Sequence, residues 1–108
     1  MTTILLVEDD EMNKDMLSRR LMKKGYEVIF AVDGQEAIDM AQSEKPDVIL
    51  MDMGLPVKTG LEATKEIKEN SDTTSIPIIA LTANAMAEHR QKALEGGFDE
   101  FETKPVRL

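Results

Sequence analysis

The chain has 108 residues, 42% of them hydrophobic, which is enough for one domain with its own core and too few for two domains of ordinary size. Acidic residues outnumber basic ones by 21 to 13, and the resulting formal charge of -8 argues against nucleic-acid binding, because phosphate backbones are held by clustered Lys and Arg. The sequence has no cysteine, which excludes disulfides and thiolate metal sites, and no apolar run approaches the roughly 20 residues of a membrane span. We therefore expect a single cytoplasmic domain without membrane contact.

The first part of the chain predicts a strand, a helix, a second strand and a second helix. The initial strand, residues 4–7, is a continuous run of mostly branched side chains, which suits a strand covered on both faces of a parallel sheet. The helix after it ends at Gly25, a typical left-handed stop, and the next helix has Asp33 as its cap, with Glu36 three residues on as in a capping box. The expected ranges are 11–24 for the first helix, with Met16, Leu17 and Leu21 on one face, 26–32 for the second strand, and 34–43 for the second helix, with Ala37, Ile38 and Ala41 at helical spacing.

The second part of the chain continues the same alternation. Two further apolar runs, residues 48–51 and 76–81, predict strands, and a weaker fifth strand is expected at 98–102. A third helix between the two strong strands is marked by Leu61, Thr64 and Ile67, and a fourth, marked by Met86, Ala93 and Leu94, ends at Gly96 and Gly97.

This alternation of strands and helices predicts an α/β fold. Repeated right-handed crossovers place helices on both faces of a parallel sheet. We expect a flavodoxin-like, doubly wound sheet of five strands in the order 2-1-3-4-5, with four helices visible in the sequence. In such sheets, functional groups gather beyond the carboxyl ends of the strands.

Carboxylates follow two of the predicted strands. Glu8 and Asp9 leave the first strand and Asp52 leaves the third, so neighbouring strands would bring three carboxylates to one crevice. Such a set of oxygen ligands, without Cys or His, suits Mg2+ best. A carboxylate beside this ion can attack a phosphoryl group, and we assign that role to Asp52. At other strand ends, Lys104 offers a cation and Thr82 a hydroxyl donor for the same phosphate.

Four segments of the sequence resemble the signature segments of bacterial two-component receiver domains, of the kind found in chemotaxis regulators. They are LLVEDDE, VILMDMGLP, IIALTA and TKP, and they occur in the family's order and at typical separations. The resemblance covers nearly the whole chain, so residues 1–108 are interpreted as one receiver domain. Such a domain is a phosphorelay switch that catalyses only its own aspartyl phosphorylation and dephosphorylation.

The resemblance also implies a ligand set and a phosphorylation site. Asp52 would be both the phosphoacceptor and a metal ligand, Asp9 the direct metal carboxylate, Glu8 a ligand through water, and Gly54 a ligand through its backbone carbonyl. The metal would be Mg2+, with Mn2+ as an alternative, and Asp10 would be a neighbour of the site and not a ligand. Gly54 has no side chain to screen the phosphoryl group from water, which suggests a hypothesis about the lifetime of the phosphate.

Four residues near the predicted fourth and fifth strands complete the resemblance. Thr82 would be the switch hydroxyl that moves to the phosphate, and Phe101 the aromatic side chain that turns inward with it. Lys104 would pair with the phosphate, and Pro105 would follow a cis peptide bond that aims this lysine.

The expected partners also follow from the resemblance. The phosphodonor would be a histidine kinase or a histidine phosphotransfer protein, docking on the first helix and its adjoining loops. The output would be a downstream protein or a covalently linked output domain. The family has a fifth helix, for which the chain is too short at its C-terminal end, so we expect apolar surface on the face of the first helix. Truncation, continuation into another domain, and a dimer that covers this face are the three explanations, of which we favour truncation.

Three other functions compete with this interpretation. A haloacid-dehalogenase-like phosphatase also uses a strand-end aspartate with Mg2+, but needs a second aspartate where this chain has Gly54. A flavin-binding electron carrier shares the topology, but the acidic residues after the first strand would repel its phosphate. A phosphorylation-independent interaction module with the receiver fold is disfavoured by the intact Asp52, Thr82 and Lys104.

The methionines provide a last expectation. The sequence has eight of them, which suggests an adaptable binding surface. Core or helix packing nevertheless explains the positions that we considered, which are Met12, Met16, Met40, Met51 and Met86.

Overall fold

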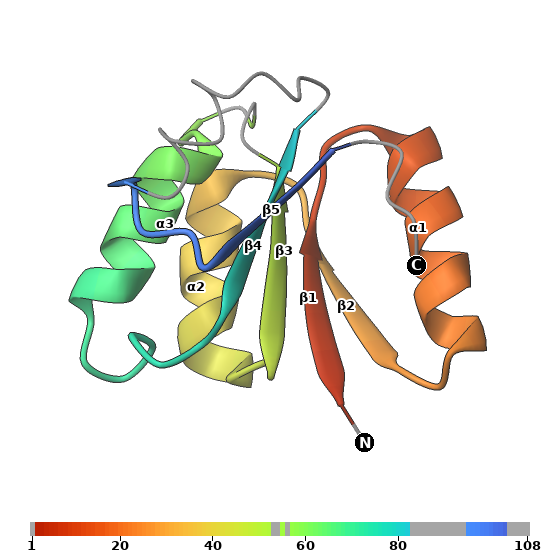
Figure 1. Cartoon of the computed structure of the whole chain (residues 1–108), viewed down its shortest axis with the longest axis horizontal. Helices are drawn as coiled ribbons and strands as arrows, with labels where there is room; N and C mark the ends of the chain where they lie inside the picture. Colours follow the sequence, from red (N-terminus) through yellow and green to blue (C-terminus); the bar gives the residue numbers. More distant parts are fainter. Residues whose placement is uncertain (1, 53–54, 56, 83–94, 104–108) are drawn as a thin grey trace.

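The computed structural model describes residues 2–52, 55, 57–82 and 95–103, which form one parallel sheet with helices on both faces (Figure 1). The sheet has five strands in the order β2-β1-β3-β4-β5. In chain order the elements are β1 (Thr3–Val7), α1 (Glu11–Lys23), β2 (Glu27–Ala31), α2 (Gly34–Glu44), β3 (Val48–Asp52), α3 (Gly60–Glu69), β4 (Ile78–Thr82) and β5 (Glu100–Thr103). The flavodoxin-like parallel arrangement predicted from the alternation of elements is confirmed by the order of β2, β1, β3 and β4. Met86, Ala93 and Leu94, which mark the predicted fourth helix, lie outside the described ranges, and only its predicted end at Gly96 and Gly97 lies within them.

The register of the sheet brings the carboxyl ends of its strands to one edge. All four pairings are parallel. Asp52, the last residue of β3, lies beside Leu81 of β4, and Thr82 at the end of β4 pairs with Thr103 at the end of β5. The chemically active residue types at the strand ends are therefore neighbours across the sheet.

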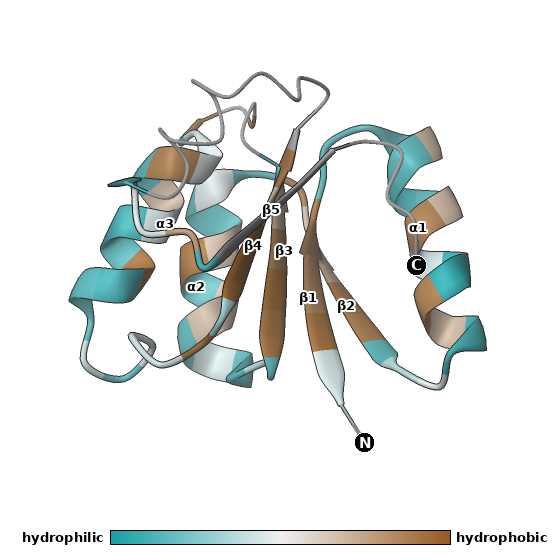
Figure 2. Ribbon diagram, in the orientation of Figure 1, coloured by the Kyte–Doolittle hydropathy of each residue, from teal (hydrophilic) through white to brown (hydrophobic). Residues whose placement is uncertain are grey.

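The core consists of two layers, one on each face of the sheet. Alternate residues of a strand point to opposite faces, and because both faces are covered, β1 to β4 are apolar along most of their length (Figure 2). One layer joins Leu5, Val7, Ile49 and Met51 to Ala37 and Ala41 of α2 and to Ala63 and Ile67 of α3, while the other joins Ile4, Leu6 and Leu50 to Leu17 and Leu21 of α1.

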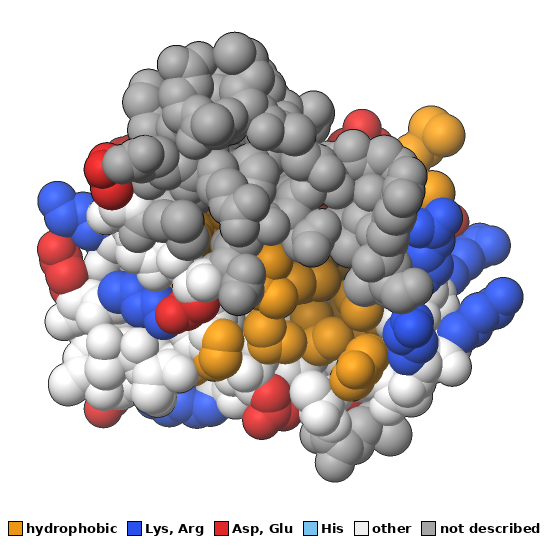
Figure 3. All heavy atoms as spheres, in the orientation of Figure 1, with side chains coloured by type: hydrophobic (Ala, Val, Ile, Leu, Met, Phe, Trp, Pro, Cys, Tyr) orange, Lys and Arg blue, Asp and Glu red, His pale blue; other side chains and the backbone are white. Residues whose placement is uncertain are grey.

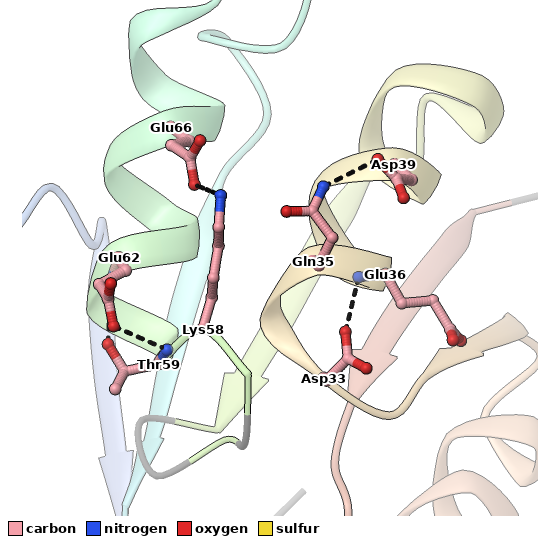
Figure 4. A network of polar contacts seen from close by, with 8 residues as sticks. All are labelled: Asp33, Gln35, Glu36, Asp39, Lys58, Thr59, Glu62 and Glu66. Carbon is pink, nitrogen blue, oxygen red and sulfur yellow. Dashed lines mark hydrogen bonds and ion pairs between the residues drawn. The ribbon is translucent and has the colours of Figure 1, made fainter.

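Side chains fix the first turn of each helix. Asp33 accepts a hydrogen bond from the backbone N–H of Glu36 at 2.8 Å, so the predicted cap of α2 is confirmed. A reciprocal capping box is found at α3, where Thr59 Oγ1 accepts from Glu62 N–H and Glu62 Oε1 accepts from Thr59 N–H, both at 3.2 Å (Figure 4). These contacts fix where α2 and α3 begin, and both helices pack on the same face of the sheet.

Polar contacts also fix the segments around the far end of α3. The hydroxyl of Thr73 donates to the carbonyl of Ile67 at 2.7 Å and satisfies a carbonyl in the last turn of the helix. Lys68 pairs with Asp99 at 2.9 Å, and the same carboxylate oxygen of Asp99 accepts from the N–H of Ile78 at 2.8 Å. These contacts tie α3, the start of β4 and the approach to β5 together.

The expectation that packing explains the methionines is only partly correct. Met51 is fully buried and Met40 packs against the core, as predicted. Met12 is 82% exposed and Met16 is 42% exposed, so the prediction is wrong for both, because α1 turns its leucines toward the sheet and these two side chains away from it. Met86 lies outside the described residues.

An apolar hollow of about 250 Å3 lies on the α1 face of the sheet. Figure 3 shows hydrophobic side chains gathered in the middle of this face, with Lys and Arg along the α1 side. The hollow is lined by Thr2, Ile4, Leu21, Tyr26, Val48, Leu50 and Ile79. The apolar side chains expected on this face thus line a hollow, although Ile4, Leu21 and Leu50 among them are almost fully buried. Within the described part of the chain, no helix has the length and apolar character needed to cross a membrane.

Candidate metal centre

Three carboxylates meet at the carboxyl edge of the sheet. Glu8, Asp9 and Asp52 each offer an oxygen, and these oxygens all lie within 4.8 Å of one another. The sheet register explains the cluster, because Val7 pairs with Met51 and the residues that follow each of them therefore emerge side by side. The convergence predicted from the sequence, which required the first and third strands to be neighbours, is thus observed.

Burial makes this cluster electrostatically costly. Glu8 is 2% exposed and Asp52 is 9% exposed, while Asp9 is exposed to solvent. Carboxylates crowded together repel one another, and more so where burial keeps water away. The side-chain amide of Asn13 donates to Glu8 Oε1 at 3.4 Å. The donor set consists of oxygen atoms alone, which fits a hard divalent cation such as Mg2+.

Asp10 stands next to the cluster in sequence but has a different role. Its Oδ1 accepts hydrogen bonds from the N–H groups of Met12 at 2.9 Å and Asn13 at 3.3 Å, so its side chain caps α1. This cap starts the helix directly after Asp9. As a result, the first turn of α1 returns Asn13 to the strand end, where it reaches Glu8.

The structure locates the other predicted site residues to different extents. Thr82 ends β4, one position beyond the residue that pairs with Asp52, and Phe101 pairs with Ala80 in β5. Gly54, Lys104 and Pro105 lie outside the described residues.

Asn13 is a site neighbour that our sequence interpretation missed. The available signal was its position three residues after the cap Asp10, within the first turn of a helix that begins at the strand end. That signal identifies a residue near the cluster, but it does not show whether the amide contacts Glu8 or solvent.

A family model matches almost the whole chain. The model described as "Response regulator receiver domain" matches residues 4–108. The chain is also 38% identical over 106 residues to the polar-differentiation response regulator DivK of Brucella anthropi, an alignment that covers 98% of this chain and 86% of that protein.

Solved structures show the same similarity in three dimensions. The receiver domain of the sensor histidine kinase PA1611 from Pseudomonas aeruginosa PAO1, crystallised with a magnesium ion in its active-site cleft, superposes with a TM-score of 0.91 at 40% identity, over 98% of this chain and 87% of that one. The receiver domain of the response regulator Ssk1 from Saccharomyces cerevisiae, in complex with the histidine phosphotransfer protein Ypd1, gives a TM-score of 0.89 at 32% identity, over 99% of this chain and 81% of that one.

Proposed function

The chain belongs to the family of response regulator receiver domains, signalling modules of two-component systems, and we propose that it receives a phosphoryl group on Asp52. The observation that carries this proposal is the cluster of Glu8, Asp9 and Asp52, whose oxygens lie within 4.8 Å of one another. A buried carboxylate at the end of a rigid strand is well placed for attack on a phosphoryl group, because phosphoryl transfer depends mainly on positioning and charge stabilisation.

The reaction forms one bond and breaks another. A carboxylate oxygen of Asp52 attacks phosphorus, and the P–N bond of a donor phosphohistidine breaks. The imidazole leaves with the electron pair of that bond and takes up a proton. The product is an aspartyl phosphate at the edge of the sheet.

The acidic residues beside Asp52 would hold Mg2+. We propose that Asp9 coordinates the ion directly, Glu8 through water, and Gly54 through its backbone carbonyl. When bound, Mg2+ neutralises negative charge on the phosphoryl oxygens. The burial of Glu8 keeps its charge directed at this site, and the Asn13 amide holds one of its oxygens in place.

Residues at the ends of β4 and β5 would respond to the phosphate. We propose that the Thr82 hydroxyl donates to a phosphoryl oxygen and that Phe101 turns inward as Thr82 moves. Lys104, which follows the last residue of β5, would pair with the phosphate, and Pro105 would keep a preceding cis bond that aims this lysine. The support is positional, since Thr82 and Thr103 are paired at the same edge of the sheet as Asp52.

We assign partners by family membership. The phosphodonor would be a histidine kinase or a histidine phosphotransfer protein, as the complex of Ypd1 with the similar Ssk1 receiver domain suggests. A downstream protein or a linked output domain would read the switch, and the cytoplasm would be the compartment. A dimer that covers the apolar hollow on the α1 face stays a prediction.

The decisive experiment measures phosphorylation of the purified protein. We expect acetyl phosphate with Mg2+ to add the mass of one phosphoryl group, mapped to Asp52, and beryllofluoride to form a stable adduct that also needs Mg2+. Asp52→Asn should abolish both. Asp72→Asn, at an exposed aspartate between α3 and β4, should change neither. If wild type forms no adduct with Mg2+ present, the protein is instead an interaction module with the receiver fold.

A further inference from the structure

Gly34, the first residue of α2, lies against the segment that leads from β3 to α3. A Cβ atom placed on this buried glycine would stand 2.2 Å from the carbonyl oxygen of Lys58 and 2.7 Å from its Cβ. Separations below 3.0 Å are essentially never found for real Cβ atoms. The glycine is thus required for space, and any side chain here would force α2 and the Lys58 backbone apart by about 1 Å.

Contacts with α3 hold the same segment from the other side. Lys58 Nζ lies 2.5 Å from Glu66 Oε2, and Thr59 forms the capping box of α3 (Figure 4). Toward Asp52, Leu55 is 5% exposed and belongs to the core. Lys58 and Thr59 are therefore held between α2 and α3, and Leu55 is held by the core.

Val57 shows that these contacts impose a conformation that the local sequence does not favour. Its φ is +66°, in the left-handed region that β-branched residues rarely adopt, and its side chain is 79% exposed. A strained residue with so exposed a side chain is held by its neighbours and not by its own packing. Residues 57–59, which follow Asp52 by five to seven positions, are therefore held in a conformation that their neighbours impose.

We propose that Gly34 is a positioning residue for the Asp52 site. By allowing the Lys58 backbone to lie against α2, it sets where residues 57–59 lie and, through them, the geometry around Asp52. This inference rests on the proposed phosphoacceptor function. Because α3 is fixed by its cap and core residues, a displacement of the Lys58 backbone would be carried along the chain toward Asp52.

The test compares Gly34→Ala with Gly25→Ala. Gly25 has a φ of +93° and no atom within 4 Å of a built Cβ, so alanine there strains the backbone without touching a neighbour. It lies between α1 and β2, at the opposite edge of the sheet from Asp52. Both variants should unfold at lower temperature than wild type. Only Gly34→Ala should slow Asp52 phosphorylation by acetyl phosphate and Mg2+, by about 10- to 100-fold per folded molecule, because a misplacement of about 1 Å has effects of that size.

Two readouts separate positioning from mere destabilisation. Circular dichroism gives the folded fraction at the assay temperature, and backbone amide shifts measured without metal should change around residues 57–59 and at Asp52 in Gly34→Ala alone. Equal rates per folded molecule in wild type and Gly34→Ala overturn the inference and leave the proposed function intact. A wild type that is not phosphorylated at Asp52 overturns the proposed function instead.

A milder variant covers the case in which Gly34→Ala does not fold. Glu66→Gln removes the charge that holds Lys58 to α3. The ion pair is partly exposed, so its loss should leave the fold intact. We expect phosphorylation per folded molecule to slow by up to about fivefold and the melting temperature to fall by no more than several degrees, since an exposed ion pair contributes up to about 1 kcal/mol. An unchanged rate in Glu66→Gln overturns the inference that the position of Lys58 affects the Asp52 site.

Discussion

Neutralising Asp9 should change the stability of the protein in opposite directions with and without Mg2+. In the absence of divalent cations, Asp9→Asn removes the repulsion of this charge by Glu8 and Asp52, so the variant should be more stable than wild type. In saturating Mg2+, wild type gains the binding free energy of the ion and the variant gains less. The order of stability should therefore reverse.

The size of each effect follows from the structure. Two unit charges 4.8 Å apart repel by about 0.9 kcal/mol at the dielectric constant of water and by about 3.5 kcal/mol at an effective value of about 20. Asp9 is exposed, so the lower figure applies to each of its two pairs, and salt screens it further. We expect Asp9→Asn to raise the free energy of unfolding by about 1–2 kcal/mol at low salt. Mg2+ at 100 times its dissociation constant should stabilise wild type by about 2.7 kcal/mol.

Asp10→Asn is the matched control. It neutralises the adjacent charge, but asparagine caps a helix as well as aspartate does, so the cap of α1 should persist. The assay is urea unfolding followed by far-ultraviolet circular dichroism, because the chain has no tryptophan and only one tyrosine. Our reasoning would be refuted if Mg2+ stabilised wild type and Asp9→Asn equally, or if Asp9→Asn were the less stable protein without divalent cations.

Three further predictions concern other parts of the molecule. Thr73→Val should lower the free energy of unfolding by about 1–3 kcal/mol, because the buried carbonyl of Ile67 loses its donor. Thr64→Val should be neutral or stabilising, since the buried Thr64 hydroxyl has no partner among the described residues. Urea unfolding of both variants and wild type measures the two effects. Burial raises the pKa of Asp99, but hydrogen bonds from Lys68 and a backbone N–H, and the charge of Lys68, bring it below the ordinary 3.8. Its stabilisation is therefore complete above pH 3.8 and lost as pH falls through the lower folded value, so thermal melts of Asp99→Asn and wild type should differ at neutral pH and converge in acid. Gly54→Asn should lose phosphate more slowly than wild type in a dephosphorylation time course, and equal rates would contradict a role for access of water at this position.

The site was predictable from the sequence to the extent that it depends on strand ends. Apolar runs end at Glu8 and at Asp52, and a parallel sheet brings the ends of neighbouring strands together. Helix caps were predictable where the side chain itself acts, as at Asp33. The capping box of Thr59 and Glu62 was also visible as a T-x-x-E pattern, but our prediction of α3 relied on apolar spacing alone.

Other features depend on distances that no local pattern contains. Periodicity placed Met16 on the same face as Leu17 and Leu21, yet the rotation of α1 on the sheet decides which side chains at the border of that face are buried. In the sequence, Asn13 is one polar residue of a helix, and only its distance from Glu8 shows that it contacts the site.

The sequence by itself determined the alternation of elements, the fold class and the residue types at the edge of the sheet, because apolar periodicity and strand-end chemistry are local properties. Only the tertiary structure decided that the oxygens of Glu8, Asp9 and Asp52 lie within 4.8 Å of one another and that Gly34 leaves room for the Lys58 carbonyl. Both depend on how strands and helices far apart in sequence pack together. Such packing is set by the whole core, so the acidic residues are readable in the sequence and their geometry is not.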